Sequence, residues 1–439
     1  MPLRVLINQR EKSRRRPKMQ TRTLAVVLLF PLLAISMGAQ SPTVHADKAS
    51  MDPERLARVP VMMRSYVEKG RVAGAVTLVA RHGTVASLEA VGFQDLESRK
   101  PMRIDTIFQI MSMTKPITAV GLMILAEDGK LSLGDPVERY LPEFKGMWLV
   151  ESRDGDKSMT LKRPSRSVTI RDLLTHTSGF PPTPPEAFRP FEVWDTTPMD
   201  KLVAVTAQEP LNFEPGSRFE YSSMGFEAVG RVIEVVSGMA FDEFLATRLF
   251  APLGMKDTFF FPPRDKYDRI ASVYVLEDGK LKPVGTDNPG GGKWKYRQGA
   301  KNPLPDGGLY TTAPDLFALY QMLLNGGTYH GARILSPATV ELMTTSLTGD
   351  IPVWGESGQG YGLGWLVNRD SRSFFTLPFT SIGTFSHAGR FSTEGWVDPT
   401  RDLVGIFLIQ REPYTTEERD AFMSVVASAI VRPTSEHAP

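Results

Sequence analysis

The stretch from Gln109 to Val120, Gln-Ile-Met-Ser-Met-Thr-Lys-Pro-Ile-Thr-Ala-Val, decides how the chain is interpreted. Ser112 and Lys115 lie three residues apart at the head of an apolar run, so on a helix their side chains share one face and can meet. If the helix begins at about residue 111 or 112, Pro116 falls in its first turn, where a missing N–H costs little. Ser112 would then lie at the helix N-terminus, where free N–H groups favour negative charge.

Two interpretations of this pair stay open when it is taken alone. A serine at the start of a helix is commonly only an N-cap. A serine beside a partly desolvated lysine can instead act as a nucleophile, because burial lowers the pKa of the amine and lets it accept the hydroxyl proton. The other motifs of the chain are needed to choose between the two.

Further motifs recur downstream of this stretch. They are IRDLLTHTSG (170–179), FEPGSRFEYSS (213–223), GGLYTTAPDL (307–316) and SHAG (386–389). In this order, and together with residues 108–118, they resemble the active-site elements of the serine β-lactamase and penicillin-binding-protein superfamily. The resemblance is closest to its class C-like branch, the family VIII carboxylesterases, and spans nearly the whole chain beyond the N-terminal segment.

The resemblance implies catalytic roles for three residues. Ser112 corresponds to the nucleophile and Lys115 to its proton acceptor. Tyr221 corresponds to the tyrosine that exchanges protons with both, protonating the leaving group and later activating water. Alone, Tyr221 would be interpreted as a buried core aromatic, and only its motif favours the catalytic role.

The last motif implies a substrate-binding edge. His387 stands where the family has the lysine of Lys-Thr-Gly, and Gly389 leaves the backbone open to close approach. By resemblance the N–H of Arg390 joins that of Ser112 in an oxyanion hole. We expect the His387 imidazole to bond to substrate or to Tyr221.

Two departures from the family pattern favour neutral ester substrates. Ser223 replaces the asparagine of Tyr-Ser-Asn and has no amide donor for an acylamido side chain. His387 removes the fixed positive charge that would hold the carboxylate of a β-lactam or of a D-Ala-D-Ala peptide.

The predicted fold is mixed α/β (α+β) and β-lactamase/transpeptidase-like, with an antiparallel sheet flanked by helices and a mostly helical inserted domain. Apolar runs at 73–80 and 84–91, and again at 395–398 and 402–409, predict strand pairs at the two ends of the chain. We expect a sheet domain from residues 47–131 and 305–433, an insertion from 132–304, and a flexible tail at 434–439. Helices are predicted at 52–69, 117–127, 223–236, 313–324 and 416–431.

Residues 1–46 have the pattern of a signal peptide. Basic residues precede an apolar run at 24–37, and Val44-His45-Ala46 suits signal peptidase. This segment carries eight basic residues and one acidic residue, so without its +7 the chain changes from +2 to about −5. We therefore expect a periplasmic or secreted protein of the bacterial envelope, with no nucleic-acid partner and with membrane contact only through the signal segment.

Several other chemistries lack their motifs. The chain has no cysteine, which excludes disulfides and thiolate metal sites. It has neither the Gly-x-Ser-x-Gly of α/β-hydrolases nor the His-Glu-x-x-His of zinc hydrolases. We expect no metal and no organic cofactor.

These patterns together predict a serine hydrolase that forms an acyl-enzyme on Ser112. The first expectation is a carboxylesterase of short or medium acyl esters, whose partner is a small-molecule ester or amide. A β-lactamase or D-Ala-D-Ala carboxypeptidase-type hydrolase is an alternative, as is a non-catalytic penicillin-binding-like sensor. The sequence predicts neither the acyl specificity nor the oligomeric state.

Overall fold

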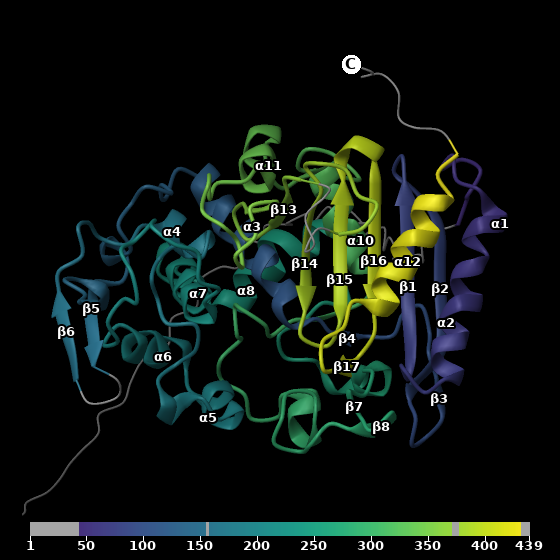
Figure 1. Cartoon of the computed structure of the whole chain (residues 1–439), viewed down its shortest axis with the longest axis horizontal. Coiled ribbons are helices and arrows are strands. Elements are labelled where there is room, and N and C mark those ends of the chain that lie inside the picture. The colour runs from purple at the N-terminus through teal and green to yellow at the C-terminus, as the bar shows by residue number, and fades with distance from the viewer. Residues whose placement is uncertain (1–43, 155–157, 371–376, 432–439) are drawn as a thin grey trace, which may run out of the picture. The chain divides into compact units, whose positions relative to one another are not determined.

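The main sheet is built from both ends of the chain. The computed structural model describes residues 44–154, 158–370 and 377–431. Eight antiparallel strands within these residues follow the order β12-β13-β14-β15-β16-β1-β2-β3, and Figure 1 shows β16 and β1 side by side. Their bounds are β1 (Gly74–Arg81), β2 (Thr84–Asp95), β3 (Lys100–Pro101), β12 (Gln359–Tyr361), β13 (Leu366–Asn368), β14 (Phe385–Gly389), β15 (Thr393–Asp398) and β16 (Leu403–Leu408).

Helices cover both faces of this sheet. Val76 and Leu78 of β1 belong to one apolar core, whereas Val79 belongs to a second core on the opposite face, as the period of two requires. The second core is covered by α1 (Pro53–Leu56), α2 (Arg58–Glu68) and α12 (Glu417–Ser428), and the first by α3 (Thr114–Glu127) and α10 (Ala313–Leu324). The predicted fold class is therefore confirmed.

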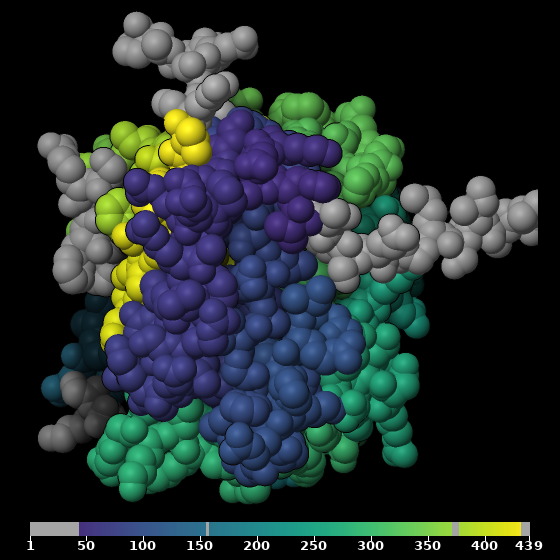
Figure 2. All heavy atoms as spheres, turned by 90° about the vertical axis from the view of Figure 1, so that its right-hand side faces the viewer, coloured from purple at the N-terminus to yellow at the C-terminus, as the bar shows by residue number. Residues whose placement is uncertain are grey.

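The N-terminal and C-terminal helices lie against each other. Met51 forms a β-bridge with Ile430, and the N–H of Asp52 donates to Ala429 O. Figure 2 shows the purple N-terminal residues beside the yellow C-terminal ones on this face. The N–H of His45 donates to Val85 O at 2.7 Å, so the first described residues are attached to the sheet.

The predicted strand pairs and helices are present, with limits that shift by a few residues. The helix expected at 52–69 divides at Ala57 into α1 and α2; the Asp52 carboxylate caps α1 by accepting the N–H groups of Glu54 and Arg55. The helix expected at 223–236 is α7 (Ser223–Ser237). A short 3₁₀ turn, η1 (Met111–Met113), precedes α3 and places Pro116 in the first turn of the helix, as expected.

The middle of the chain has more residues in helices than in strands, but it holds short strands that the sequence did not predict. Its helices are α4 (Ile170–Leu174), α5 (Phe191–Thr196), α6 (Met199–Thr206), α7, α8 (Phe241–Leu245) and α9 (Ala251–Leu253), and the hairpin is β5 (Leu149–Asp154) with β6 (Ser158–Lys162). The limits predicted for the insertion, 132 and 304, stay a prediction.

Small sheets and one more helix complete the fold. β17 (Arg411–Glu412) pairs in parallel with β7 (Tyr274–Glu277), and β7 pairs with β8 (Lys280–Pro283). The remaining elements are β4 (Phe108–Gln109), β9 (Tyr310–Thr311), β10 (Thr328–Tyr329), β11 (Ala332–Arg333) and α11 (Pro337–Thr344). No helix in the described part of the chain is long and apolar enough to cross a membrane.

Candidate active site

The structure brings Ser112 and Lys115 together at the start of α3. The turn η1 holds Ser112, partly exposed, and α3 carries Lys115, whose side chain is 0% exposed. Lys115 Nζ donates to Ser112 Oγ at 3.3 Å. The two side chains, three residues apart in the sequence, therefore meet as predicted.

Lys115 is held as an ammonium. Its Nζ donates to the carbonyl oxygen of Asp306 at 2.9 Å and lies 3.3 Å from the Asp306 carboxylate. The same Nζ lies 4.7 Å from the ring centroid of Tyr221, to which it also hydrogen-bonds. Burial lowers the pKa of Lys115, but the charges of Tyr221 and Asp306 raise that pKa by more, and the net shift is upward.

Tyr221 is positioned by His176. The N–H of Ser222 donates to His176 Nδ1 at 3.0 Å, and the His176 and Tyr221 rings lie 4.3 Å apart between centroids. Burial and the charge of Lys115 hold the pKa of His176 well below its ordinary value, so the ring is neutral. His176 therefore organises the backbone beside Tyr221 through a hydrogen bond.

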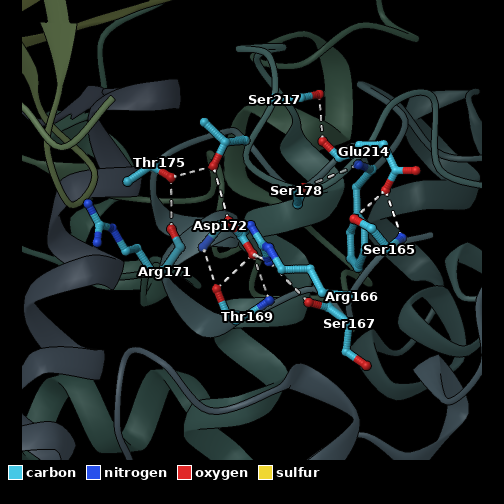
Figure 3. Close-up of polar contacts among 12 residues, drawn as sticks. Ser165, Arg166, Ser167, Thr169, Arg171, Asp172, Thr175, Ser178, Glu214 and Ser217 are labelled. Atoms are coloured by element: carbon cyan, nitrogen blue, oxygen red, sulfur yellow. Dashed lines mark hydrogen bonds and ion pairs between the residues drawn. The ribbon is translucent and has the colours of Figure 1, made fainter. Parts of the chain in front are cut away.

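The turn that carries His176 is fixed by a polar network around Asp172 (Figure 3). Asp172 accepts the N–H and hydroxyl of Thr169 in a capping box at the start of α4, and Arg166 forms two hydrogen bonds to the same carboxylate. At the other end of α4, the hydroxyls of Thr175 and Thr177 bond to each other at 2.8 Å. These contacts hold His176 in the left-handed conformation, with φ 58°.

His387 hydrogen-bonds to Tyr361 and not to Tyr221, and its expected contact with substrate stays a prediction. Its Nδ1 donates to Ala388 O at 2.7 Å, so its Nε2 accepts the hydroxyl of Tyr361 at 3.2 Å. Burial and the charge of Lys115 lower the pKa of His387 to about 3, which leaves a neutral imidazole. The ring of Tyr221 lies 6.1 Å from that of His387 between centroids.

The end of β14 closes on the turn that carries Ser112. A Cβ at Gly389 would collide with Ile110 O, so only glycine allows this approach. Arg390 follows directly, and its side chain forms an ion pair with Glu412. Ser223 opens α7, where its N–H donates to Pro182 O.

A cavity of about 560 Å³ opens onto Ser112. Tyr221, His387, Gly389 and Arg390 line it with Ser112, so the structure gathers these predicted site residues around one space. The described lining also includes Trp354, Leu366, Leu377, Ser386, Ala388, Glu394, Tyr414, Thr416, Arg419 and Asp420, but not Ser223. Within the described ranges, no cluster of three or more His, Asp or Glu side chains is arranged to hold a metal ion.

Residues 61–429 match the family model described as Beta-lactamase. The chain belongs to the Beta-lactamase family. This confirms the resemblance to the β-lactamase and penicillin-binding-protein superfamily, and the protein is a serine hydrolase.

Two relatives and one solved structure are similar to this chain over different lengths. An uncharacterized protein of Mycobacterium tuberculosis is 32% identical over 80% of this chain and 89% of its own. Esterase EstB of Burkholderia gladioli is 33% identical over 59% of this chain and 64% of its own. The solved structure of EstCE1, a hydrolase with promiscuous acyltransferase activity, has a TM-score of 0.70 and 26% identity over 87% of this chain and 99% of its own.

Sequence reasoning missed three residues of this Beta-lactamase family site. Asp306 contacts Lys115 and directly precedes the Gly-Gly motif. Its position beside that motif was the sequence feature that could have identified it as a site residue. Tyr361 reaches His387 from β12, and Trp354 lies on a loop at the cavity, 5.9 Å from the Tyr221 ring between centroids. Neither of these two aromatic residues belongs to a motif that the sequence analysis used.

Acid should destabilise the protein partly through His387. In the unfolded chain the His387 imidazole takes up a proton below about pH 6.5, whereas in the folded protein it does so only near pH 3. The stability that neutral His387 contributes is therefore fully present above pH 6.5 and is lost as the pH falls from 6.5 toward 3. We expect the free energy of unfolding to fall less steeply between pH 6 and 4 in His387→Gln, by up to about 1.4 kcal/mol per pH unit. Urea unfolding at a series of pH values measures this; equal slopes in both proteins would contradict the neutral assignment.

Proposed function

We propose that the protein is a carboxylesterase that hydrolyses neutral esters of short or medium acyl chains through an acyl-enzyme on Ser112. The observation that carries this proposal is the cavity on Ser112, where both arginines of the described lining are already paired. Arg390 forms an ion pair with Glu412, and Arg419 forms ion pairs with Glu394 and Asp420. Neither guanidinium is left to bind a substrate carboxylate.

The neutral state of His387 supports the same substrate class. In this family pattern the corresponding lysine would supply a fixed positive charge, whereas burial keeps His387 uncharged at neutral pH. A β-lactam or a D-Ala-D-Ala peptide carries a carboxylate that would lose its water of hydration in the cavity without gaining a cation. A neutral ester avoids this desolvation cost.

The apolar lining suits an acyl chain. Trp354, Leu366 and Leu377 line the cavity together with Ser112. Trp354 is 50% exposed, which leaves its indole surface free to cover part of a bound substrate. Burial of the acyl methylenes against these side chains would contribute about 0.8 kcal/mol for each group.

We propose that the reaction proceeds in two steps. Ser112 Oγ attacks the ester carbonyl, and its proton passes to the Lys115–Tyr221 pair, which returns a proton to the departing alkoxide. The N–H groups of Ser112 and Arg390 stabilise the tetrahedral oxyanion. A water molecule then attacks the acyl-enzyme and gives its proton to the same pair. The pair passes this proton to Ser112 Oγ as the bond to the acyl carbon breaks, which releases the acid and restores free Ser112.

Replacing the nucleophile tests this proposal. Ser112→Ala should lower kcat/KM for p-nitrophenyl butyrate by about 10³-fold or more, because no acyl-enzyme can form. The exposed Ser428→Ala is the matched control, since its hydroxyl only donates to Val425 O, and it should keep parental activity. Stopped-flow or steady-state absorbance at the nitrophenolate band measures both variants.

A chromogenic cephalosporin, assayed in parallel, separates the alternatives. The proposal predicts ester turnover with little cephalosporin turnover. Faster turnover of the cephalosporin than of the ester would favour a β-lactamase or D-Ala-D-Ala carboxypeptidase-type activity. Stable acylation by the cephalosporin without turnover of either compound would indicate a sensor.

We also propose that the protein is exported. The predicted signal segment lies outside the described residues except for Val44–Ala46. N-terminal sequencing of the protein from the periplasm or medium should find a mature chain that starts at Asp47. A full-length chain recovered from the cytoplasm would contradict export.

A further inference from the structure

A row of buried acidic groups continues behind Lys115, away from the substrate cavity. Asp306 contacts Lys115 Nζ, and Glu227 of α7 hydrogen-bonds to Asp306. The Glu227 side chain is fully buried, and it accepts the Asn302 amide at 3.1 Å and the Trp194 indole N–H at 3.3 Å. Two carboxyl groups in hydrogen-bond contact in a buried site cannot both be ionised without a large electrostatic cost.

The surroundings show which of the two carboxyl groups holds the proton. The Asp306 carboxylate forms an ion pair with the Lys115 ammonium, with 3.3 Å between the two groups. Among the described residues, the hydrogen-bond donors to Glu227 are a neutral amide and a neutral indole. Burial and the charge of Asp306 raise the pKa of Glu227 well above the ordinary value. The proton therefore belongs on Glu227, whose hydroxyl donates to the Asp306 carboxylate.

The loop that carries Asp306 is fixed from several sides. Arg297, itself in a buried ion pair with Asp195, donates to Pro303 O and Gly308 O at either end of this loop. The hydroxyl of Thr118, on α3 one turn after Lys115, donates to Pro305 O at 2.6 Å. On α7, Gly230 lies one turn after Glu227, and a Cβ there would collide with Pro305.

These fixed contacts keep Asp306 between α3 and α7. The helix α3 supplies Lys115 and α7 supplies Glu227, so the loop sets the distance from each to the Asp306 carboxylate. The arrangement is therefore preorganised and does not depend on bound substrate.

We propose that Glu227 and Asp306 are positioning residues that share one proton, and that their single negative charge keeps Lys115 an ammonium beside Ser112 and Tyr221. Asp306 acts through Lys115, and Glu227 acts through Asp306. The pair thereby sets the pH at which the Lys115–Tyr221 pair can take the proton of Ser112.

Tyr221 also raises the pKa of Lys115, but it belongs to the proton-exchanging pair itself, and the remaining ionisable groups around Lys115 supply no negative charge. His176 and His387 face it from the α4 turn and from β14, and burial keeps both neutral. The Asp195–Arg297 ion pair on the far side of Glu227 carries no net charge. Asp306 is thus the carboxylate whose removal changes the charge next to Lys115.

Two substitutions test the proposal, because one should shift the pH dependence of the rate and the other should not. Asp306→Asn removes the negative charge, so the Lys115–Tyr221 pair loses its proton more easily and the acidic limb of the rate profile should move to lower pH by about 1–3 units. Glu227→Gln replaces a protonated acid by a neutral amide of the same shape, so the acidic limb should stay in place. An infrared difference spectrum between parent and Glu227→Gln at pH 7 should show the loss of a protonated carboxylic acid C=O band.

The dependence of the rate on pH is measured in two ways. Only the first of them, the ester assay, rests on the proposed esterase function. The first is kcat/KM for p-nitrophenyl butyrate against pH, and the second is the rate at which a fluorophosphonate labels Ser112 against pH. Labelling without ester turnover would reject the esterase proposal and leave the pH comparison intact.

Several results would overturn the inference. Equal shifts in Asp306→Asn and Glu227→Gln would mean that both carboxyl groups are ionised, and no shift in either would mean that Asp306 does not set the charge at Lys115. Retention of the protonated C=O band in Glu227→Gln would place the proton elsewhere. Asp306→Ser and Glu227→Met carry the same charge changes and replace any variant that does not fold by circular dichroism.

Discussion

A fully buried ammonium is stable only with a counter-charge and hydrogen-bond acceptors within reach, and Lys115 imposes this constraint on the whole site. Its amine contacts Ser112 in the turn just before α3, Asp306 on a distant loop and Tyr221 ahead of α7. Three separate parts of the chain must therefore be folded together before the lysine can be buried. The contacts that would serve the proposed catalysis are therefore also contacts that the fold requires.

The sheet supplies the other side of the site. β1 pairs with β16, which brings the two ends of the chain together and places β15 and β14 next in order. β14 pairs with β13 only through Leu366↔Ser386 and Val367↔Phe385, so its stretch from His387 to Gly389 forms the edge that faces Ser112. His387 on this edge is neutral, and both arginines of the described cavity lining are paired, whereas the charged Lys115 lies behind Ser112. In the proposed reaction, substrate would bind on the His387 side and protons would move on the Lys115 side.

The sequence predicted the parts of this site that depend on local spacing or on a motif. Ser112 and Lys115 meet because residues three apart share a helix face, and Tyr221 was placed by its motif. The contact between Glu227 and Asp306 was not predictable, because it depends on the path of a loop fixed by Arg297. The hydrogen bond between His387 and Tyr361 was not predicted, because Tyr361 lies in a segment without a recognised motif.

The same reasoning explains the fold. Strands such as β1 were predicted from their continuous apolar runs, and every residue of β1 is buried. Every residue of β6 is exposed, and its five residues alternate between polar and apolar without forming such a run. The β5–β6 hairpin was therefore missed, although hairpin pairing holds it in place.

The proposed reaction requires that Ser112 Oγ carries the acyl group. Protein quenched with acid during turnover of p-nitrophenyl butyrate can be digested and mapped by mass spectrometry. The account predicts a butyryl adduct on the peptide that contains Ser112, and its disappearance once substrate is exhausted. An adduct on any other residue, or turnover that leaves every peptide unmodified even when deacylation is made rate-limiting, would contradict it.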